Sequence, residues 1–368
     1  MTRIYVTTAT GGLSTDVAPV GGGVAVLEAL LPALAARADY EVTVLRPAAS
    51  PGEREHDEVR WVDLPVAVLR DAEPDALLHL GERCYARFAL QWEAALRRFF
   101  EAVDPAGAVV LANDVSEGPP FAWLHGRGFR QLVLYHVVVA DFFARQYLAG
   151  RYGLRISAAR AAQLWRGAER LGLGRLAPEI ARLVWAKEGE SARCAEALVA
   201  PSAPLGEALA ACYPELGVEG RTHVVPWGVI GEADPGLRAR RGETLAEYEV
   251  SDDRFAGYVG GEAKWRLFAA ADLFCSLSHY EAYGLTIAQA LASGTPVLAT
   301  GHQGARAMVR PEFGWVVGDG EREIAGGVER AVALDLRPMR EAAADWGRGN
   351  GFGEAARAVI AIIDGVSG

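Results

Sequence analysis

Short apolar, β-branched runs alternate with longer stretches of helical period along the first half of the chain. This alternation is typical of βαβ units and of a mainly parallel sheet that helices cover on both faces. The strands expected in this half are residues 3–8, 40–45, 60–64, 108–112 and 131–136.

A second series of short strand-like runs follows Pro201. These runs are residues 223–226, 254–259, 272–276, 296–300 and 314–317. Because prolines punctuate short elements between Pro201 and Pro235, we place a domain boundary in that region. The pattern predicts an α/β protein of two doubly wound domains, residues 1–203 and 204–345, with a C-terminal helix within 346–368.

The composition is that of an ordinary globular protein, with 51% hydrophobic residues, 23% charged residues and a mean hydropathy of +0.10. The formal net charge of −10 repels nucleic acid, which we exclude as a partner. Residues 282–305 are uncharged, but Gly, Gln and Pro interrupt them, so we expect no transmembrane span. The first residues predict a strand instead of a signal peptide, so the expected location is the cytoplasm.

The cysteines and the basic residues each have a distinctive distribution along the chain. The cysteines lack metal-ligand spacing and are expected to be isolated, small buried side chains. They are Cys84, Cys194, Cys212 and Cys275.

Residues 150–187 form a basic helical insert in an acidic chain, with seven Arg and one Lys against two Glu. This insert is either an acceptor-side or weak peripheral membrane contact that attracts anions, or a set of solvated helix faces.

A glycine cluster, residues 21–23, precedes an apolar helical run over 24–36. Glycines before a helix let a ligand approach the backbone closely, and the free N–H groups favour a phosphate or a hydroxyl. Gly22 and Gly23 are therefore candidate binding residues, with a plain tight turn as the alternative.

The segment 276–300 carries the strongest pattern of polar and glycine residues. A strand is expected to end near Ser278, a loop carries Glu281, and Gly284, Leu285 and Thr286 begin a helix. The first amides of a helix have no partner within it and can hold a diphosphate. A carboxylate before the helix and Gln289 within it can bind sugar or ribose hydroxyls.

Here the sequence resembles the retaining GT-B glycosyltransferases of the glycosyl transferase group 1 family, whose signature is E-x7-E followed by A-x-G-x-P-V. The matching residues are Glu281, Tyr283, Gly284, Leu285, Ala292, Gly294, Pro296 and Val297. His136, after the expected strand 131–136, lies where the family has an active-site histidine. The resemblance implies two Rossmann-like domains facing an interdomain cleft, the second of them abbreviated.

The resemblance also implies roles for individual residues. Glu281 and His136 would be the catalytic residues at the transferred sugar, and the amides of residues 284–286 would hold the diphosphate. Tyr283, Gln289, Gly22 and Gly23 complete the implied binding set. Without a family role, His136 is a structural histidine at a strand end and Glu281 an ordinary carboxylate before a helix.

Three departures from the family pattern bear on activity. Gln289 replaces the second glutamate of the signature, and Ala307 replaces a later glutamate with Arg306 beside it. The third departure is a shortened segment between residues 229 and 254, which lacks the R-x4-K pair that neutralises the leaving diphosphate. Arg238 and Arg241 are the available substitutes, with a solvated charge run as the alternative.

The function implied is transfer of a sugar, with retention, from a UDP-, GDP- or dTDP-sugar to an unknown acceptor hydroxyl. No metal and no cofactor besides the donor is expected, since no Asp-x-Asp cluster is placed to hold a metal. Asp114, at the end of a strand, is an acceptor-contact candidate or a turn-forming residue. The alternative functions are a catalytically degenerate GT-B protein that acts as a binding or partner subunit, and a pseudo-glycosyltransferase of natural-product biosynthesis.

Overall fold

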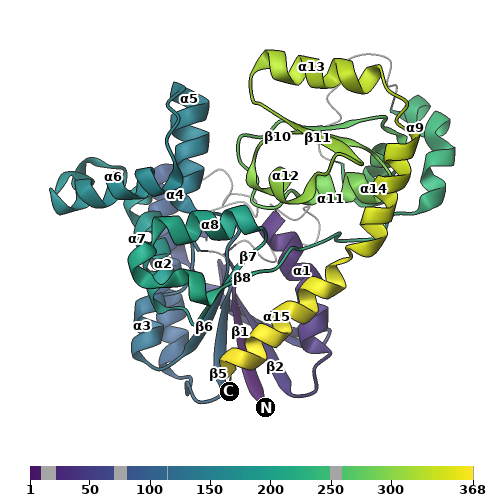
Figure 1. Ribbon diagram of the computed structural model, residues 1–368. Coiled ribbons are helices and arrows are strands. Elements are labelled where there is room, and N and C mark those ends of the chain that lie inside the picture. The colour runs from purple at the N-terminus through teal and green to yellow at the C-terminus, as the bar shows by residue number, and fades with distance from the viewer. Residues whose placement is uncertain (10–21, 70–80, 114, 249–258, 368) are drawn as a thin grey trace. The chain divides into compact units, whose positions relative to one another are not determined.

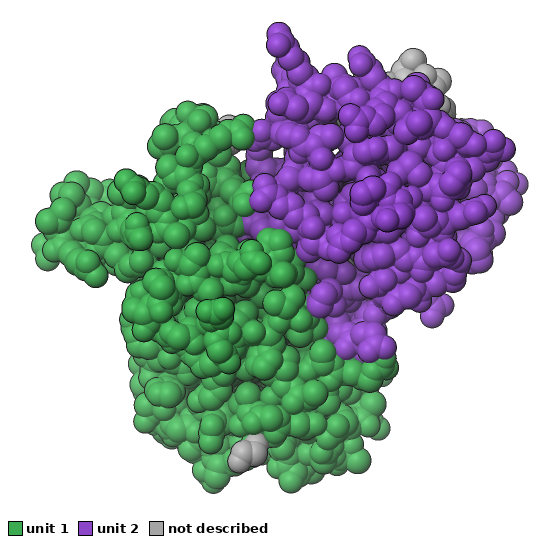
Figure 2. All heavy atoms as spheres, viewed as in Figure 1, with its two compact units in different colours: residues 1–225, 356–368 green, residues 226–355 purple. Residues whose placement is uncertain are grey.

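The computed structural model describes residues 1–9, 22–69, 81–113, 115–248 and 259–367. The chain divides into two compact units, which are coloured separately in Figure 2. Unit 1 comprises residues 1–225 and 356–368, and unit 2 comprises residues 226–355.

Within the described residues, the sheet of unit 1 has eight strands in the order β3-β4-β2-β1-β5-β6-β7-β8 (Figure 1). These are β1 (Thr2–Thr7), β2 (Tyr40–Ala48), β3 (Gly52–His56), β4 (Val59–Pro65), β5 (Ala108–Ala112), β6 (Arg130–Leu134), β7 (Ala197–Ala200) and β8 (Thr222–Val224). Neighbouring strands are parallel except β3 and β4. Every residue of β5 is buried, as expected for a parallel strand between two helical layers.

Helices cover both faces of this sheet, with α1 and α15 on one face and α2, α3 and α7 on the other (Figure 1). The helices of this unit are α1 (Gly22–Ala35), α2 (Glu82–Glu101), α3 (Phe121–Gly126), α4 (Val139–Phe142), α5 (Gly150–Tyr152), α6 (Ala158–Arg170), α7 (Glu179–Cys194), α8 (Ala203–Cys212) and most of α15 (Phe352–Ser367). A π-helical stretch, Phe143–Ala149, connects α4 to α5.

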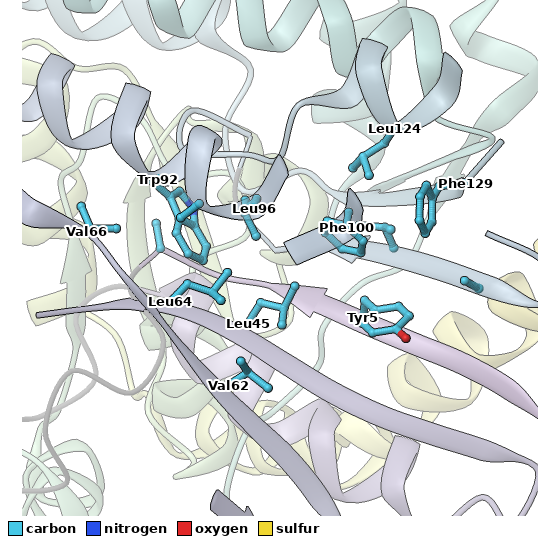
Figure 3. Packing of buried hydrophobic residues seen from close by; sticks show 14 of the residues in the cluster. Tyr5, Leu45, Val62, Leu64, Val66, Trp92, Leu96, Phe100, Leu124 and Phe129 are labelled. Carbon is cyan, nitrogen blue, oxygen red and sulfur yellow. The ribbon is translucent and has the colours of Figure 1, made fainter. Parts of the chain in front are cut away.

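The core beneath α2 is aromatic and fully buried (Figure 3). Trp92, Leu96 and Phe100 of α2 pack against the face of the sheet that carries Tyr5 and Leu45. The rings of Tyr5 and Phe100 meet edge to face with centroids 5.5 Å apart, a preferred geometry for an aromatic pair. This packing fixes one helical layer on the sheet.

The C-terminal residues 356–368 cluster with unit 1. The Tyr40 hydroxyl, at the start of β2, donates a hydrogen bond to Asp364 Oδ1 at 2.6 Å. Arg37 forms an ion pair with the same carboxylate at 3.5 Å. The last turns of α15 are thus attached to the first sheet by polar contacts.

Unit 2 has a three-stranded parallel sheet in its described residues, with the order β11-β10-β9. Its strands are β9 (Phe274–Ser276), β10 (Val297–Thr300) and β11 (Gly314–Val317). Its helices are α9 (Arg241–Glu247), α10 (Gly261–Ala270), α11 (Leu285–Ala292), α12 (Gln303–Met308), α13 (Glu321–Val332) and α14 (Arg337–Gly349). Each of β9 and β10 is therefore followed by a helix, as in a doubly wound fold.

The helices α11 and α14 pack so closely that their backbones are in contact. A Cβ added to Gly347 of α14 would lie 2.4 Å from the Cα atom of Ala292 in α11. Real Cβ atoms do not come this close, so glycine is required for the two helices to pack as they do. The position of α11, which begins at the predicted binding loop, depends on this contact.

The predicted strands of unit 1 are confirmed with small changes at their ends, and β9, β10 and β11 are confirmed in unit 2. The strand predicted at residues 254–259 lies mostly outside the described residues. The charged strand β3 was not predicted, because its sequence GEREH has no apolar alternation and most of its side chains are exposed. Such charge is common on edge strands, where it discourages pairing with other chains.

Two expectations from the sequence need correction. The first division between the units falls at 225/226, within the predicted region 201–235 but later than residue 203, and the second falls at 355/356 instead of 345. The reason is that β8, expected in the second domain, pairs in parallel with β7 and completes the first sheet. In addition, Cys84 and Cys275 are exposed, although all four cysteines are free thiols and Cys194 and Cys212 are buried as expected.

We predict that Gly347→Ala lowers the free energy of unfolding of unit 2 by about 1–3 kcal/mol, the usual cost of forcing an extra carbon into a packed site. Gly349→Ala, in the same helix, is the matched control, because nothing lies within 4 Å of its added Cβ. Urea denaturation of both variants measures the difference. Equal midpoints for the two variants would contradict the close packing of α11 on α14.

Candidate functional site

The first group of predicted residues lies at the carboxyl ends of strands in unit 1. Gly22 and Gly23 are the first two residues of α1. A Cβ added to Gly23 would lie 2.8 Å from Cδ2 and 3.1 Å from Nε2 of His136. The structure therefore brings Gly23 and His136 into contact, and only glycine leaves room for the imidazole ring.

His136 follows the end of β6 and is held by the end of the neighbouring strand. Its Nε2 atom lies 3.2 Å from Oδ1 of Asn113, which directly follows β5. The Asn113 N–H in turn donates to the carbonyl of Thr7, the last residue of β1, at 3.0 Å. Burial lowers the pKa of His136 to about 4, so the imidazole is neutral at physiological pH.

Buried polar atoms without a hydrogen-bond partner gather at the same edge of the sheet. Within the part of the chain that the structure describes, these include Thr7 Oγ1 and Asn113 Nδ2. Such atoms cost free energy unless another group satisfies them, so this edge is suited to a polar ligand. Asn113 was not among the predicted site residues, whereas its neighbour Asp114, which was, lies outside the described residues.

A buried carboxylate fixes the turn that carries His136. Glu188 of α7 accepts hydrogen bonds from the N–H of Val139 at 2.5 Å and from the Tyr213 hydroxyl at 2.9 Å. Val139 is the first residue of α4, three residues after His136. Burial raises the pKa of Glu188 to about 7. This carboxylate was not predicted, because its partners are far from it in the sequence.

The second group of predicted residues lies on the loop between β9 and α11 in unit 2. Gly284 has a φ of +87°, a left-handed conformation that strongly favours glycine, and it immediately precedes α11. The first α-helical bond of α11 runs from the Ala288 N–H to the Gly284 carbonyl. The N–H groups of Leu285 and Thr286 thus have no partner within the helix. Leu285 is half-buried and Thr286 is exposed.

Three backbone contacts hold this loop in place. The Gly304 N–H donates to the Glu281 carbonyl at 2.9 Å, and a Cβ on Gly304 would fall on the backbone of Tyr283. The Tyr283 hydroxyl accepts a hydrogen bond from the Gly228 N–H at 2.7 Å. Tyr283 is buried, so it supports the loop from behind. The Glu281 side chain is half-buried, and burial raises the pKa of its carboxyl group.

Gln289 is also engaged in the fold of unit 2. Its side chain is buried, and its amide nitrogen donates to the Ile230 carbonyl at 3.1 Å. The polar side chain expected to bind ribose therefore attaches α11 to the chain segment that enters this unit. The structure brings Glu281, Gly284, Leu285 and Thr286 together at one loop, with Tyr283 and Gln289 buried behind them.

Arg238 and Arg241 do not reach this loop, which corrects their expected role as substitutes for the diphosphate clamp. Arg238 donates to the carbonyls of residues 269–271, at the carboxyl end of α10, and to Asp272 at 3.0 Å. Arg241 contacts Ala270 and the other oxygen of Asp272. These contacts lie before the amino end of β9, whereas Glu281 follows its carboxyl end. Cations stabilise a helix carboxyl end, so the fold itself uses this charge.

Arg306 is a candidate that the sequence analysis noted without assigning it a role. It lies on α12 and is exposed, and its Nη2 atom is 3.3 Å from the position of a Cβ on Gly301. Gly301 and α12 follow β10, and Gly304 of the same segment contacts the Glu281 loop. A guanidinium is therefore present at the carboxyl edge of this sheet. The sequence signal for Arg306 is its place next to Ala307, the residue that replaces a glutamate of the family pattern.

No group of three His, Cys, Asp or Glu side chains among the described residues is arranged to hold a metal ion. No helix among them is both long enough and apolar enough to cross a membrane.

We predict that Gly23→Ala displaces the His136 ring and moves its pKa from about 4 toward the ordinary value of 6.5, because the added carbon removes the space that buries the ring. Titration of histidine resonances by NMR, assigned with His136→Gln, measures this pKa. Gly126→Ala is the control in the same unit, since its Cβ meets nothing within 4 Å. An unshifted titration in Gly23→Ala would show that the two residues are not in contact.

A second prediction concerns pH and Glu188. Between its ordinary pKa of 4.5 and the folded value of about 7, the folded protein keeps a proton that the unfolded chain loses. Stability contributed by Glu188 therefore falls as the pH rises through this window, by about 3 kcal/mol in all. The difference in unfolding free energy between the native protein and Glu188→Gln, measured in urea at pH 5 and pH 7.5, should change accordingly. If the unfolding free energies of the native protein and Glu188→Gln change equally with pH, the Glu188 carboxyl group is not held in its neutral form by burial.

Part of the chain is similar in sequence to known proteins. Residues 229–349 match the family of glycosyl transferases group 1. Mannosylfructose-phosphate synthase of Agrobacterium fabrum is 48% identical over 97 residues, covering 21% of this chain and 21% of that protein. The matches therefore span about a fifth of the length of the curated relatives.

Solved structures match over the whole chain. Sucrose-phosphate synthase from Thermosynechococcus elongatus has a TM-score of 0.66 at 17% identity and covers 100% of this chain and 99% of its own. Anabaena HepE in complex with UDP and glucose has a TM-score of 0.57 at 12% identity, with 99% and 100% coverage. The predicted GT-B fold is thereby confirmed.

Proposed function

We propose that this protein transfers a sugar from a nucleoside diphosphate sugar to an acceptor hydroxyl, with retention. The match of residues 229–349 to the glycosyl transferases group 1 family supports the proposal. The observation that carries the proposal is the loop of residues 281–286. It places a carboxyl group, a left-handed glycine and amides that have no partner within the helix at the carboxyl edge of a parallel sheet. Ligands of doubly wound folds bind at this edge.

The diphosphate of the donor would be held by the N–H groups of Leu285 and Thr286. Left-handed Gly284 lets the backbone approach the phosphates closely, and the helix dipole favours their charge. Departure of the nucleotide builds negative charge on the diphosphate in the transition state. We assign the neutralisation of this charge to Arg306, since Arg238 and Arg241 are occupied at the end of α10.

The sugar would be held by Glu281, and the resemblance assigns a second catalytic role to His136. The Glu281 carboxyl group can accept two hydrogen bonds from neighbouring sugar hydroxyls. His136, neutral at physiological pH, orients a hydroxyl by hydrogen bonding and adds no charge. A base with a pKa of about 4 is weak, so the leaving phosphate is the better acceptor for the proton of the acceptor hydroxyl. This is the front-face mechanism of retention.

Among the donor nucleotides, UDP is the first to test, because one solved structure with the same fold contains UDP and glucose. GDP and dTDP are the alternatives. One observation favours a non-catalytic binding or partner subunit. Gln289 replaces the second glutamate of the signature, and its side chain donates to the Ile230 carbonyl, so it supports the fold at the position expected to bind ribose. A pseudo-glycosyltransferase would use the same diphosphate site.

We predict that one of these nucleotides binds the native protein and that Arg306→Ala weakens the binding about tenfold. This is the typical loss when one charge-assisted hydrogen bond to phosphate is removed. Isothermal titration calorimetry with UDP, GDP and dTDP measures both. Arg322→Ala is the control, an exposed arginine of α13 in the same unit. Failure of all three nucleotides to bind would overturn the proposed function.

The variant Glu281→Gln distinguishes the proposed transferase from the alternative, a non-catalytic binding subunit. For the enzyme, this variant lowers the rate of donor-sugar transfer to water by about a hundredfold, because it weakens contacts to the sugar in the transition state. Its affinity for the free nucleotide stays within about twofold of the native value, since the nucleotide lacks the sugar. Nucleotide binding without release of sugar from any donor would instead favour the binding subunit.

A further inference from the structure

Exposed apolar side chains are concentrated in one part of unit 1. Sixteen large hydrophobic residues of the described chain are exposed, and half of them lie within residues 143–176. They are Phe143, Tyr147, Tyr152, Leu154, Leu164, Leu171, Leu173 and Leu176. A concentration of this kind marks an interaction surface, whereas single exposed apolar residues need no explanation.

These residues lie on two projections of unit 1. Figure 1 shows α6, and the helical segment that ends in α5, extending away from the rest of the unit. We call residues 147–155 the α5 tip and residues 164–176 the α6 tip. The side chains of Leu171 and Leu176 in the α6 tip are 76% and 83% exposed, and Tyr152 in the α5 tip is 70% exposed. Exposure this high means that these side chains cover no part of the protein's own core.

The α6 helix and the beginning of the α6 tip are anchored. The rings of Trp165 and Trp185 stack with centroids 4.9 Å apart, and Arg166 donates to the Cys212 carbonyl at 2.7 Å. Ser157 accepts a hydrogen bond from the Arg160 N–H and caps the start of α6. The exposed leucines of the α6 tip are therefore presented on an anchored helix, and their exposure is not caused by a missing core beneath them.

Both tips are basic. Arg151 and Arg155 flank the exposed Tyr152 and Leu154, and Arg170 and Arg175 flank the exposed leucines of the α6 tip. All four arginines are exposed. The chain as a whole carries a net charge of −10, so this local positive charge selects an anionic partner against the overall field.

We propose that the two tips dock this protein onto the surface of an anionic lipid bilayer. Leucine and tyrosine side chains would enter the boundary between headgroups and acyl chains, while the arginines contact lipid phosphates. The charge and the convex form of the tips favour this occupant, because a bilayer accepts projecting side chains without a preformed groove. The proposal does not depend on the transferase activity, and its test reads binding alone.

The test is cosedimentation of the full chain with vesicles of phosphatidylglycerol and phosphatidylcholine in equal parts, and with vesicles of phosphatidylcholine alone. The native protein should bind the anionic vesicles and leave the neutral ones unbound. The double variant Leu171→Glu and Leu176→Glu should lower the partition coefficient by at least about tenfold. Arg170→Gln with Arg175→Gln should also lower it, and added salt should weaken native binding.

The matched control is Val332→Glu with Leu334→Glu, which changes two exposed apolar residues of unit 2 in the same way. It should bind anionic vesicles as the native protein does. Absence of native binding, or an equal loss in the control, would overturn the proposal. If the α6 tip variant leaves vesicle binding intact but converts a dimer to a monomer in sedimentation analysis, the surface instead binds a second copy of the chain.

Discussion

Backbone contacts that only glycine permits set the geometry of both groups of candidate residues. Gly23 leaves room for the imidazole of His136, and Gly304 allows its chain segment to touch the backbone of Tyr283. Gly347 brings α14 against α11, whose amino end carries the predicted diphosphate site. A side chain at any of these positions would displace a loop or helix by the width of a methyl group, which is enough to misplace a catalytic group.

Arginine side chains support the carboxyl end of α10 in unit 2. The carbonyls at the end of α10 carry partial negative charge and have no helical partners. Arg238, Arg241 and Arg340 all donate to them. Burial, together with the closeness of Arg238 and Arg241, lowers the pKa of Arg340 to about 10. Three cations beside Asp272 thus support a helix end. For this reason the proposed neutralisation of the diphosphate is assigned to Arg306.

Local patterns in the sequence predict the features of this protein that depend on neighbouring residues. Apolar runs locate most strands, and the spacing from Glu281 to Thr286 locates the loop before α11. Sheet membership of β8 could not be predicted, because a strand's sequence does not record which strand it pairs with. The contact between Glu188 and Val139, 49 residues apart, and that between Arg238 and Asp272, 34 apart, are likewise absent from any local pattern.

The neutral state of His136 constrains any mechanism that uses it. Burial penalises the imidazolium ion, and Asn113, whose Oδ1 atom lies 3.2 Å from the ring nitrogen Nε2, is an uncharged partner. Glu188, which fixes the following turn, is only partly ionised near neutral pH, since burial raises its own pKa to about 7. A proton released during transfer therefore has a poor acceptor on this side. In the transfer proposed above, the leaving diphosphate would be the better acceptor for this proton, because negative charge builds on it as it departs.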